Sequence, residues 1–201
     1  MIKILIIILL FASTCPAIAQ SGTKKELSAI LDTVYADDQN NRLKINDIEK
    51  EFGFQSEQMK QLWQEIKQKD SINLVKVKHI INQFGWPGID LVGKKGAKTI
   101  FLVIQHADSL TQVTYLPLLR DAVSQKNANP QYLALLEDRV LIRQGQPQLY
   151  GSQVKRNEKG ENEFYPIRDE IHVNERRASM GLEPIEKYAA YFNITYIVPK
   201  E

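Results

Sequence analysis

The sequence predicts a mainly α-helical fold of the α+β class: a single domain of about seven to nine helices with a small β-hairpin near residues 149–167. Three observations predict it. Apolar residues recur at helical spacing through most of the chain, glycine and proline separate these stretches, and one late segment has strand-like runs around a polar turn.

The helical stretches come first in the chain. Residues 23–36 place Leu27, Leu31 and Val34 on one stripe, as expected of a helix that faces a core, and the polar run 37–42 interrupts it. Glycine, proline or a polar cap marks the ends of most later stretches. These further helices are expected at residues 45–52, from a Ser56 cap through Ile66, and at 71–84, 110–124 and 130–143.

The run 97–106 is apolar on every side and must be buried, as a helix or as a strand. Periodicity does not decide between the two for so short a run. The neighbouring segments are helical, which favours a helix here as well.

The pattern changes after residue 148. Residues 149–156 and 163–167 are short and strand-like, and the polar turn 157–162 joins them, which predicts a hairpin. Asn174 is expected to cap a short helix that ends near Gly181. A last helix from Pro184 to Phe192 and a brief closing strand at 194–198 complete the prediction.

Residues 1–19 have the three parts of a cleavable secretory signal. Lys3 precedes an apolar run at 4–12, and Ala17-Ile18-Ala19 forms a small-residue exit. The apolar run is far shorter than the roughly 20 residues that a permanent membrane helix needs. Cys15 raises the alternative of a lipid anchor, but Ala12-Ser13-Thr14 is a poor approach to a lipidated cysteine. We therefore expect cleavage after Ala19, export to the periplasm or the medium, and one globular domain at 20–201 without membrane insertion.

Composition narrows the classes of function. The chain is 43% hydrophobic and 25% charged, with a net charge of +2, and its acids and bases are mixed, so no basic stripe indicates nucleic acid. Its one cysteine, Cys15, would leave with the signal, which excludes a disulfide and a thiol nucleophile from the mature chain. The three histidines have no metal-ligand spacing and no phosphate or dinucleotide motif is present, so neither a metal nor a cofactor is expected.

Arg139 is a polar residue in an apolar place. Helical geometry puts it in the middle of the side of helix 130–143 that carries Leu135, Leu136 and Ile142, and Asp138 lies on the flank of that side. A guanidinium that faces a core needs a carboxylate or an anionic ligand. Arg139 therefore either forms a structural ion pair, extends to the surface, or binds an anionic ligand.

His106 closes the apolar run, between Gln105 and the acid Asp108. Imidazole titrates near neutrality and is the usual general base when a partner fixes its tautomer. The structural alternative is a histidine that bonds free carbonyls at a helix end.

The segment from Gln148 to Gln153 is the third candidate region. On a strand, Gln148, Tyr150, Ser152 and Gln153 cannot all point outward, so some of their amides and hydroxyls would face inward, where Gly151 lets a backbone or a ligand come close. The alternative is a polar hairpin face that is exposed to water. Arg176 and Arg177 add two cations, which in a short helix form either a ligand contact or a solvated face.

Several of these residues belong to short motifs spread over about residues 25 to 190. The motifs are Asp38-Gln39 with Arg42, Gly85-Trp86-Pro87, Gly93 with Gly96, Gln105-His106-Ala107-Asp108, Asp138-Arg139, Gln148 with Tyr150-Gly151-Ser152-Gln153, and Arg176-Arg177 before Gly181-Leu182. In this combination the chain resembles a bacterial family classed as a domain of unknown function, with Ser152 where a threonine is expected. The resemblance implies no established activity, but its motifs coincide with the polar residues singled out above.

These features predict an exported enzyme, a hydrolase or lyase, that acts on a small polar or anionic envelope substrate. His106 would be the general acid or base, and Asp108 or Asp138 would orient it. The ligand-binding residues would be Gln105, Arg139, Gln148, Tyr150, Gln153, Arg176 and Arg177. The alternatives are a non-catalytic module that binds a small polar ligand or an envelope protein, and an interaction protein in which Arg139 and Asp138 only stabilise the core.

Overall fold

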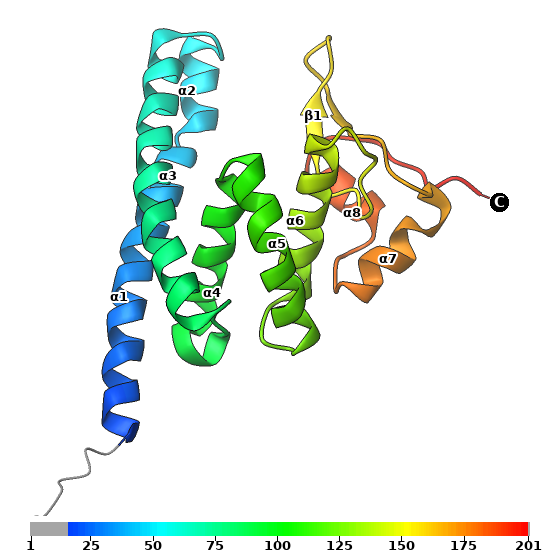
Figure 1. The fold of residues 1–201 in the computed structure, drawn as a ribbon. Helices are drawn as coiled ribbons and strands as arrows, with labels where there is room; N and C mark the ends of the chain where they lie inside the picture. The colour runs from blue at the N-terminus through cyan, green and yellow to red at the C-terminus, as the bar shows by residue number, and fades with distance from the viewer. Residues whose placement is uncertain (1–15, 201) are drawn as a thin grey trace, which may run out of the picture.

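The computed structural model describes residues 16–200 of the chain, and side chains from residue 22 onward. In this range the chain forms eight α-helices, one 3-10 helix and a two-stranded sheet (Figure 1). The predicted fold class, mainly helical with a small hairpin, is confirmed. The elements are α1 (Pro16–Arg42), α2 (Ile45–Phe52), α3 (Glu57–Phe84), α4 (Ile89–His106), α5 (Ser109–Ser124), α6 (Pro130–Arg143), β1 (Val154–Arg156), β2 (Asn162–Phe164), η1 (Glu170–His172), α7 (Val173–Ser179) and α8 (Ile185–Ala190).

Helix α4 is the centre of the molecule. It packs on α1 and α3 on one side and on α5 and α6 on the other, which Figure 1 shows as successive layers. Its run 97–106 is helical, as favoured, and Ile100 and Ile104 are fully buried in the main core. Trp86, just before α4, is also a core residue. A helix can be apolar all round only when other helices surround it, and α4 meets that condition.

Two predicted helix boundaries are wrong, and both lie where α1 faces α3. The polar run 37–42 does not interrupt the first helix, and one continuous α3 replaces the separate helices expected on either side of residues 67–70. The polar residues of the two helices pair across this contact. Lys69 bonds Asp37 at 2.6 Å, and Arg42 bonds Asp70 with two nitrogens at 3.0 and 2.7 Å. Polar runs that resemble loops in sequence therefore remain helical here.

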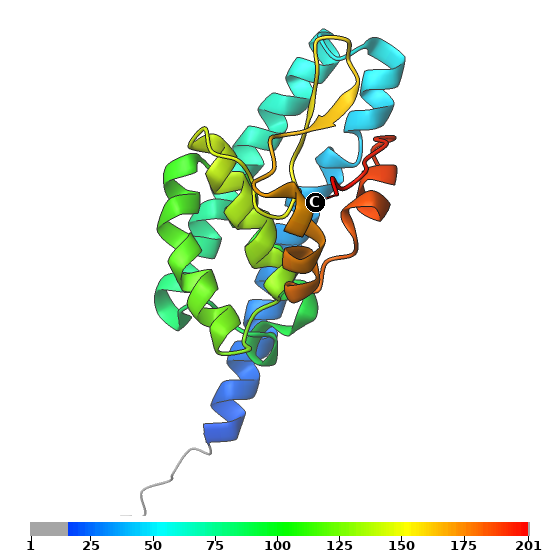
Figure 2. The ribbon, with the colours of Figure 1, turned by 90° about the vertical axis from the view of Figure 1, so that its right-hand side faces the viewer.

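The C-terminal part lies on the far side of α6, where α7, α8 and the hairpin gather (Figure 1). The hairpin is antiparallel, with Val154 opposite Phe164. Figure 2 shows it beside α2, and Arg156 of β1 forms an ion pair with Glu49 of α2 at 2.5 Å. The hairpin therefore connects the last third of the chain back to the first.

Two details of this part differ from expectation. Asn174 does not cap α7 but lies in its first turn, where its Oδ1 accepts the backbone N–H of Ile185 at 2.7 Å and links α7 to α8. Residues 194–198 form no strand. They cover the hairpin through side chains instead, with the Tyr196 ring edge-on to Phe164 at 5.4 Å.

Most of the predicted signal segment, residues 1–15 with Cys15, lies outside the described residues, and residues 16–19 begin α1. Among the helices that the structure describes, none has both the length and the apolar character needed to cross a membrane.

Candidate functional site

The carboxyl end of α4 brings together a histidine, a buried carboxylate and several arginines. His106, the last residue of α4, bonds through Nδ1 to Oδ1 of Asp38 at 2.9 Å. Asp38 lies on α1 and is only 1% exposed. Its carboxylate also accepts from Gln39 at 2.6 Å and from Arg42 at 3.2 Å. The first part of the site is thus a hydrogen-bonded pair of the half-buried His106 and the buried Asp38. Arg42, which also binds Asp70, lies beside Asp38.

The environment of Asp38 determines which nitrogen of His106 is available. Burial alone would raise the pKa of Asp38, but the hydrogen bonds from His106 and Gln39 and the charge of Arg42 bring it below its ordinary value. Asp38 is therefore a carboxylate at neutral pH and can only accept a hydrogen bond. A neutral His106 must then carry its proton on Nδ1, which leaves Nε2 as the basic nitrogen. Nε2 has no partner among the described residues, and the side chain is 20% exposed.

Arg139 of α6 lies beside this pair without a carboxylate of its own. Its Nε donates to Oε1 of Gln153 at 3.0 Å, and its Nη1 donates to the backbone carbonyl of Gln105 at 3.4 Å. No described acid lies within ion-pair distance of it. Burial lowers its pKa, and the positive charges of Arg143 and Arg42 lower it further, but a guanidinium remains charged at neutral pH. Arg139 is thus a half-buried cation with neutral partners.

Arg143, one turn further along α6, is an exposed cation whose hydrogen-bond partner is also neutral. Its Nη1 donates to the carbonyl of Ala107 at 3.0 Å, directly after α4 ends. Cations are favourable beside the last carbonyls of a helix, which explains why both arginines point there. A guanidinium has five N–H donors, however, and the bonds to protein use two on Arg139 and one on Arg143. The remaining donors can bind a carboxylate or a phosphate.

Asp138, expected on the flank of its helix, is instead fully buried. Its carboxylate accepts the backbone N–H groups of Leu149 at 2.7 Å, Tyr150 at 3.0 Å and Ser152 at 2.9 Å. Burial raises its pKa, and these three bonds oppose that rise without cancelling it. Asp138 therefore anchors the loop after α6 and does not orient His106.

Gln148 completes the same loop and is also fully buried. Its Oε1 accepts the backbone N–H of Gln153 at 2.8 Å, and its Nε2 donates to the carbonyls of Gln153 and Tyr165. These bonds fix the backbone of Gln153 where its side-chain oxygen reaches Arg139. Gln148 thus acts on the site through Gln153.

Arg176 and Arg177 hold the loop from the other side. Arg177 is 1% exposed and donates to the carbonyl of Tyr150 at 2.6 Å, while its guanidinium lies 4.9 Å from the centre of the Tyr188 ring. Arg176 donates to the carbonyl of Leu149 at 2.8 Å. Both arginines bond backbone oxygens of the loop that Asp138 anchors.

Asp108 and the Tyr150 hydroxyl also have partners outside the His106 pair. Asp108 caps α5 and accepts the backbone N–H of Thr111 at 2.8 Å, a bond that lowers its pKa. The Tyr150 hydroxyl donates to Glu137 at 3.0 Å; burial and the charge of Glu137 raise its pKa.

Of the predicted site residues, the structure brings together four at the carboxyl end of α4: Gln105, His106, Arg139 and Gln153. The others support the loop, cap α5 or bond Glu137. Sequence reasoning missed Asp38, Arg42 and Arg143 as members of the site. The first two stood in one of the motifs, but nothing local showed that a residue 68 positions before His106 would become its partner.

No group of three or more metal-ligating side chains lies close enough together to hold a metal ion in the part of the chain that the structure describes. Next to the imidazole and the arginines, Oε1 of Gln105 is buried without a hydrogen-bond partner among the described residues.

Comparison with known proteins identifies the family to which the chain belongs. A family model described as a family of unknown function, DUF6624, matches residues 24–199. No curated protein and no solved structure matches the chain. The match includes the Asp38–His106 pair, the arginines of α6 and the anchored loop, and the chain belongs to the DUF6624 family.

Proposed function

We propose that the chain is an exported enzyme, a hydrolase or lyase, that acts on a small polar or anionic envelope substrate at the carboxyl end of α4. One observation carries the proposal: His106 is oriented by the buried Asp38 and lies next to Gln105, whose carbonyl Arg139 bonds. An imidazole with a free Nε2 beside arginines without carboxylate partners can combine proton transfer with the binding of an anion. Export rests on the pattern of residues 1–19.

In this proposal, Nε2 of His106 takes a proton from water in a hydrolysis, or from carbon in an elimination, and returns it to the leaving group. Asp38 keeps the Nδ1–H tautomer and stabilises the imidazolium that forms. Arg139 and Arg143 bind the anionic group of the substrate with their unused N–H donors.

The other predicted residues take supporting roles. The orienting role first assigned to Asp108 or Asp138 passes to Asp38. Gln153 positions Arg139, and its own place depends on the loop that Asp138 anchors. Gln105 contributes a buried Oε1 that can accept a substrate hydrogen bond.

The test is a screen of the purified chain against chromogenic phosphate, sulfate and carboxylate esters, with unsaturated-product absorbance for eliminations. For any activity found, His106→Gln and Asp38→Asn should each lower kcat by about 10²-fold or more, the usual contribution of a general acid or base. Arg139→Gln should mainly raise KM. His79, an exposed histidine of α3, gives the matched control, since His79→Gln should leave turnover unchanged. Full activity in His106→Gln would contradict the proposal.

A non-catalytic binding module is the second candidate, because the free donors of Arg139 and Arg143 are sufficient to bind an anion without turnover. It predicts saturable binding of inorganic phosphate or succinate that Arg139→Gln weakens and His106→Gln leaves unchanged.

A further inference from the structure

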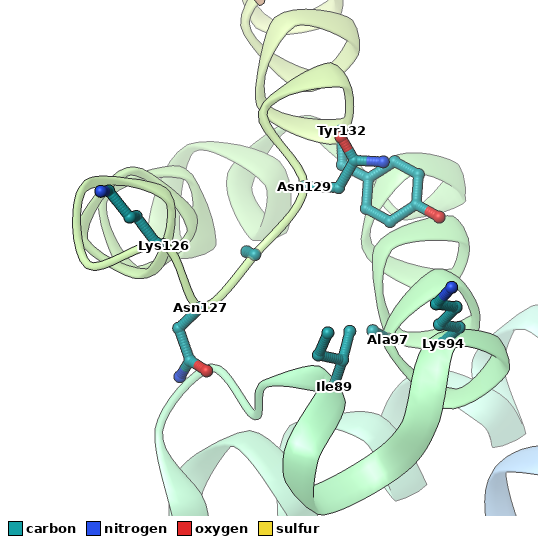
Figure 3. Close-up of a pocket in the computed structure, with 8 residues that line it drawn as sticks. Ile89, Lys94, Ala97, Lys126, Asn127, Asn129 and Tyr132 are labelled. Atoms are coloured by element: carbon teal, nitrogen blue, oxygen red, sulfur yellow. The ribbon is translucent and has the colours of Figure 1, made fainter. Parts of the chain in front are cut away.

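A cavity of about 310 Å³ lies near the amino-terminal ends of α4 and α6, whereas His106 lies at the carboxyl end of α4. It opens between the start of α4, the α5–α6 loop and the start of α6 (Figure 3). Its lining consists of Ile89, Lys94, Ala97, Lys126, Asn127, Ala128, Asn129 and Tyr132. Its volume is in the range of small-molecule sites.

The walls of this cavity are apolar and partly rigid. The Tyr132 ring is stacked on Phe101, with ring centres 4.4 Å apart and planes 5° apart, so Tyr132 has a fixed orientation. Ile89 is 49% exposed although it is a large apolar residue, and Ala97 continues the same wall. An apolar body bound here would cover surface that is otherwise exposed to water.

The polar groups at the opening are cationic or neutral. Figure 3 shows the Lys94 ammonium and the Tyr132 hydroxyl on the same side, whereas the Lys126 side chain points away from the cavity. Lys94 forms no ion pair among the described residues, and no acidic side chain lines the cavity. A bound anion would therefore meet one positive charge and a hydroxyl donor, and a bound cation would be repelled.

We infer that this cavity binds a small organic anion with an apolar body, an aromatic or short-chain monocarboxylate. The apolar part lies against Ile89, Ala97 and the Tyr132 ring, and the carboxylate lies between Lys94 and the Tyr132 hydroxyl. Ala97 and His106 lie nine positions apart, about 14 Å along α4, so this site is distinct from the proposed active site. The inference does not depend on the proposed function.

Titration of the isotope-labelled full chain with benzoate, followed by backbone amide NMR shifts, tests this directly. Benzoate should shift the signals of residues that line the cavity, saturably, and more tightly than benzyl alcohol or benzylamine. Lys94→Gln should weaken binding about fivefold, the effect of one well-placed charge pair. Lys126→Gln is the matched control, an exposed lysine of the same lining that points away, and should change binding less than about twofold.

A second variant distinguishes loss of the site from loss of the fold. Ile89→Glu introduces a carboxylate at an exposed wall position in the first turn of α4, where an acid is compatible with the helix, and it should abolish benzoate binding at an unchanged melting temperature. The inference is overturned if benzoate shows no saturable binding at the cavity, if benzyl alcohol binds as tightly, or if Lys94→Gln binds like the unaltered chain.

Discussion

Replacing Asp138 with alanine gives a sharp test of the anchored loop. The change removes the carboxylate that, among the described side chains, accepts the backbone N–H groups of Leu149, Tyr150 and Ser152. Each buried donor left unpaired costs about 1–3 kcal/mol. The alanine also no longer buries a charge, and the raised pKa of Asp138 shows that this burial is unfavourable. We therefore take the lower end for each donor and expect a loss of about 3 kcal/mol in the free energy of unfolding.

Urea denaturation followed by circular dichroism measures this loss, provided that the slope with denaturant stays unchanged. Asp108→Ala is the matched control. Asp108 also accepts a backbone N–H, that of Thr111, but at an exposed helix start, where loss of a cap costs about 1 kcal/mol. If Asp138→Ala costs no more than Asp108→Ala, the three bonds do not hold the loop and the reasoning fails.

Three further predictions concern the pair at α4 and the same loop. Because the pKa of Asp38 in the folded chain lies below its ordinary 3.8, its ionisation stabilises the fold above that pH, and this contribution disappears as the pH falls through the folded-state value. The difference in unfolding free energy between the unaltered chain and Asp38→Asn should thus shrink below pH 3.8 in urea titrations at stepped pH; a gap that widens there would contradict it. Gly151→Ala should cost about 1–3 kcal/mol, since Gly151 has φ 65° and an added Cβ would lie 2.5 Å from Cδ1 of Ile185. Valine at position 185 lacks that atom, so the double variant Gly151→Ala with Ile185→Val should lose less stability in thermal melts than the sum of the two single losses. Strictly additive losses would exclude the clash. Arg177→Met should cost about 2–4 kcal/mol by leaving the Tyr150 carbonyl without its donor, whereas an unchanged urea midpoint would show that this bond is not needed.

The sequence predicted helix ends well where the signal was local. Gly53 after α2 and Pro130 at the start of α6 lie where the helices end and begin. It failed where a polar residue is paired with a distant one. The run 37–42 looked like a loop because its partners, among them Asp70, lie on another helix and cannot be found from helical spacing.

The candidate site was likewise predicted only where the signal was local in sequence. His106 and Arg139 stood out because polar residues in apolar segments need partners, and that argument requires only one segment. The identity of those partners did not follow. Helical geometry placed Arg139 deepest in its helix, yet Asp138 is the fully buried neighbour, since the backbone amides of a later loop compensate its charge. Every residue except proline carries a backbone N–H, so the residue types do not show which of these donors will bond a buried carboxylate.

The way in which that loop is anchored also determines how it responds to reducing and oxidising conditions. Hydrogen bonds with the buried side chains of Asp138, Gln148 and Arg177 hold residues 148–153, and the one cysteine of the chain, Cys15, lies far away in sequence. No thiol takes part in these hydrogen bonds. Thiol reductants should therefore leave the loop in place, and it can assemble equally in a reducing and in an oxidising compartment.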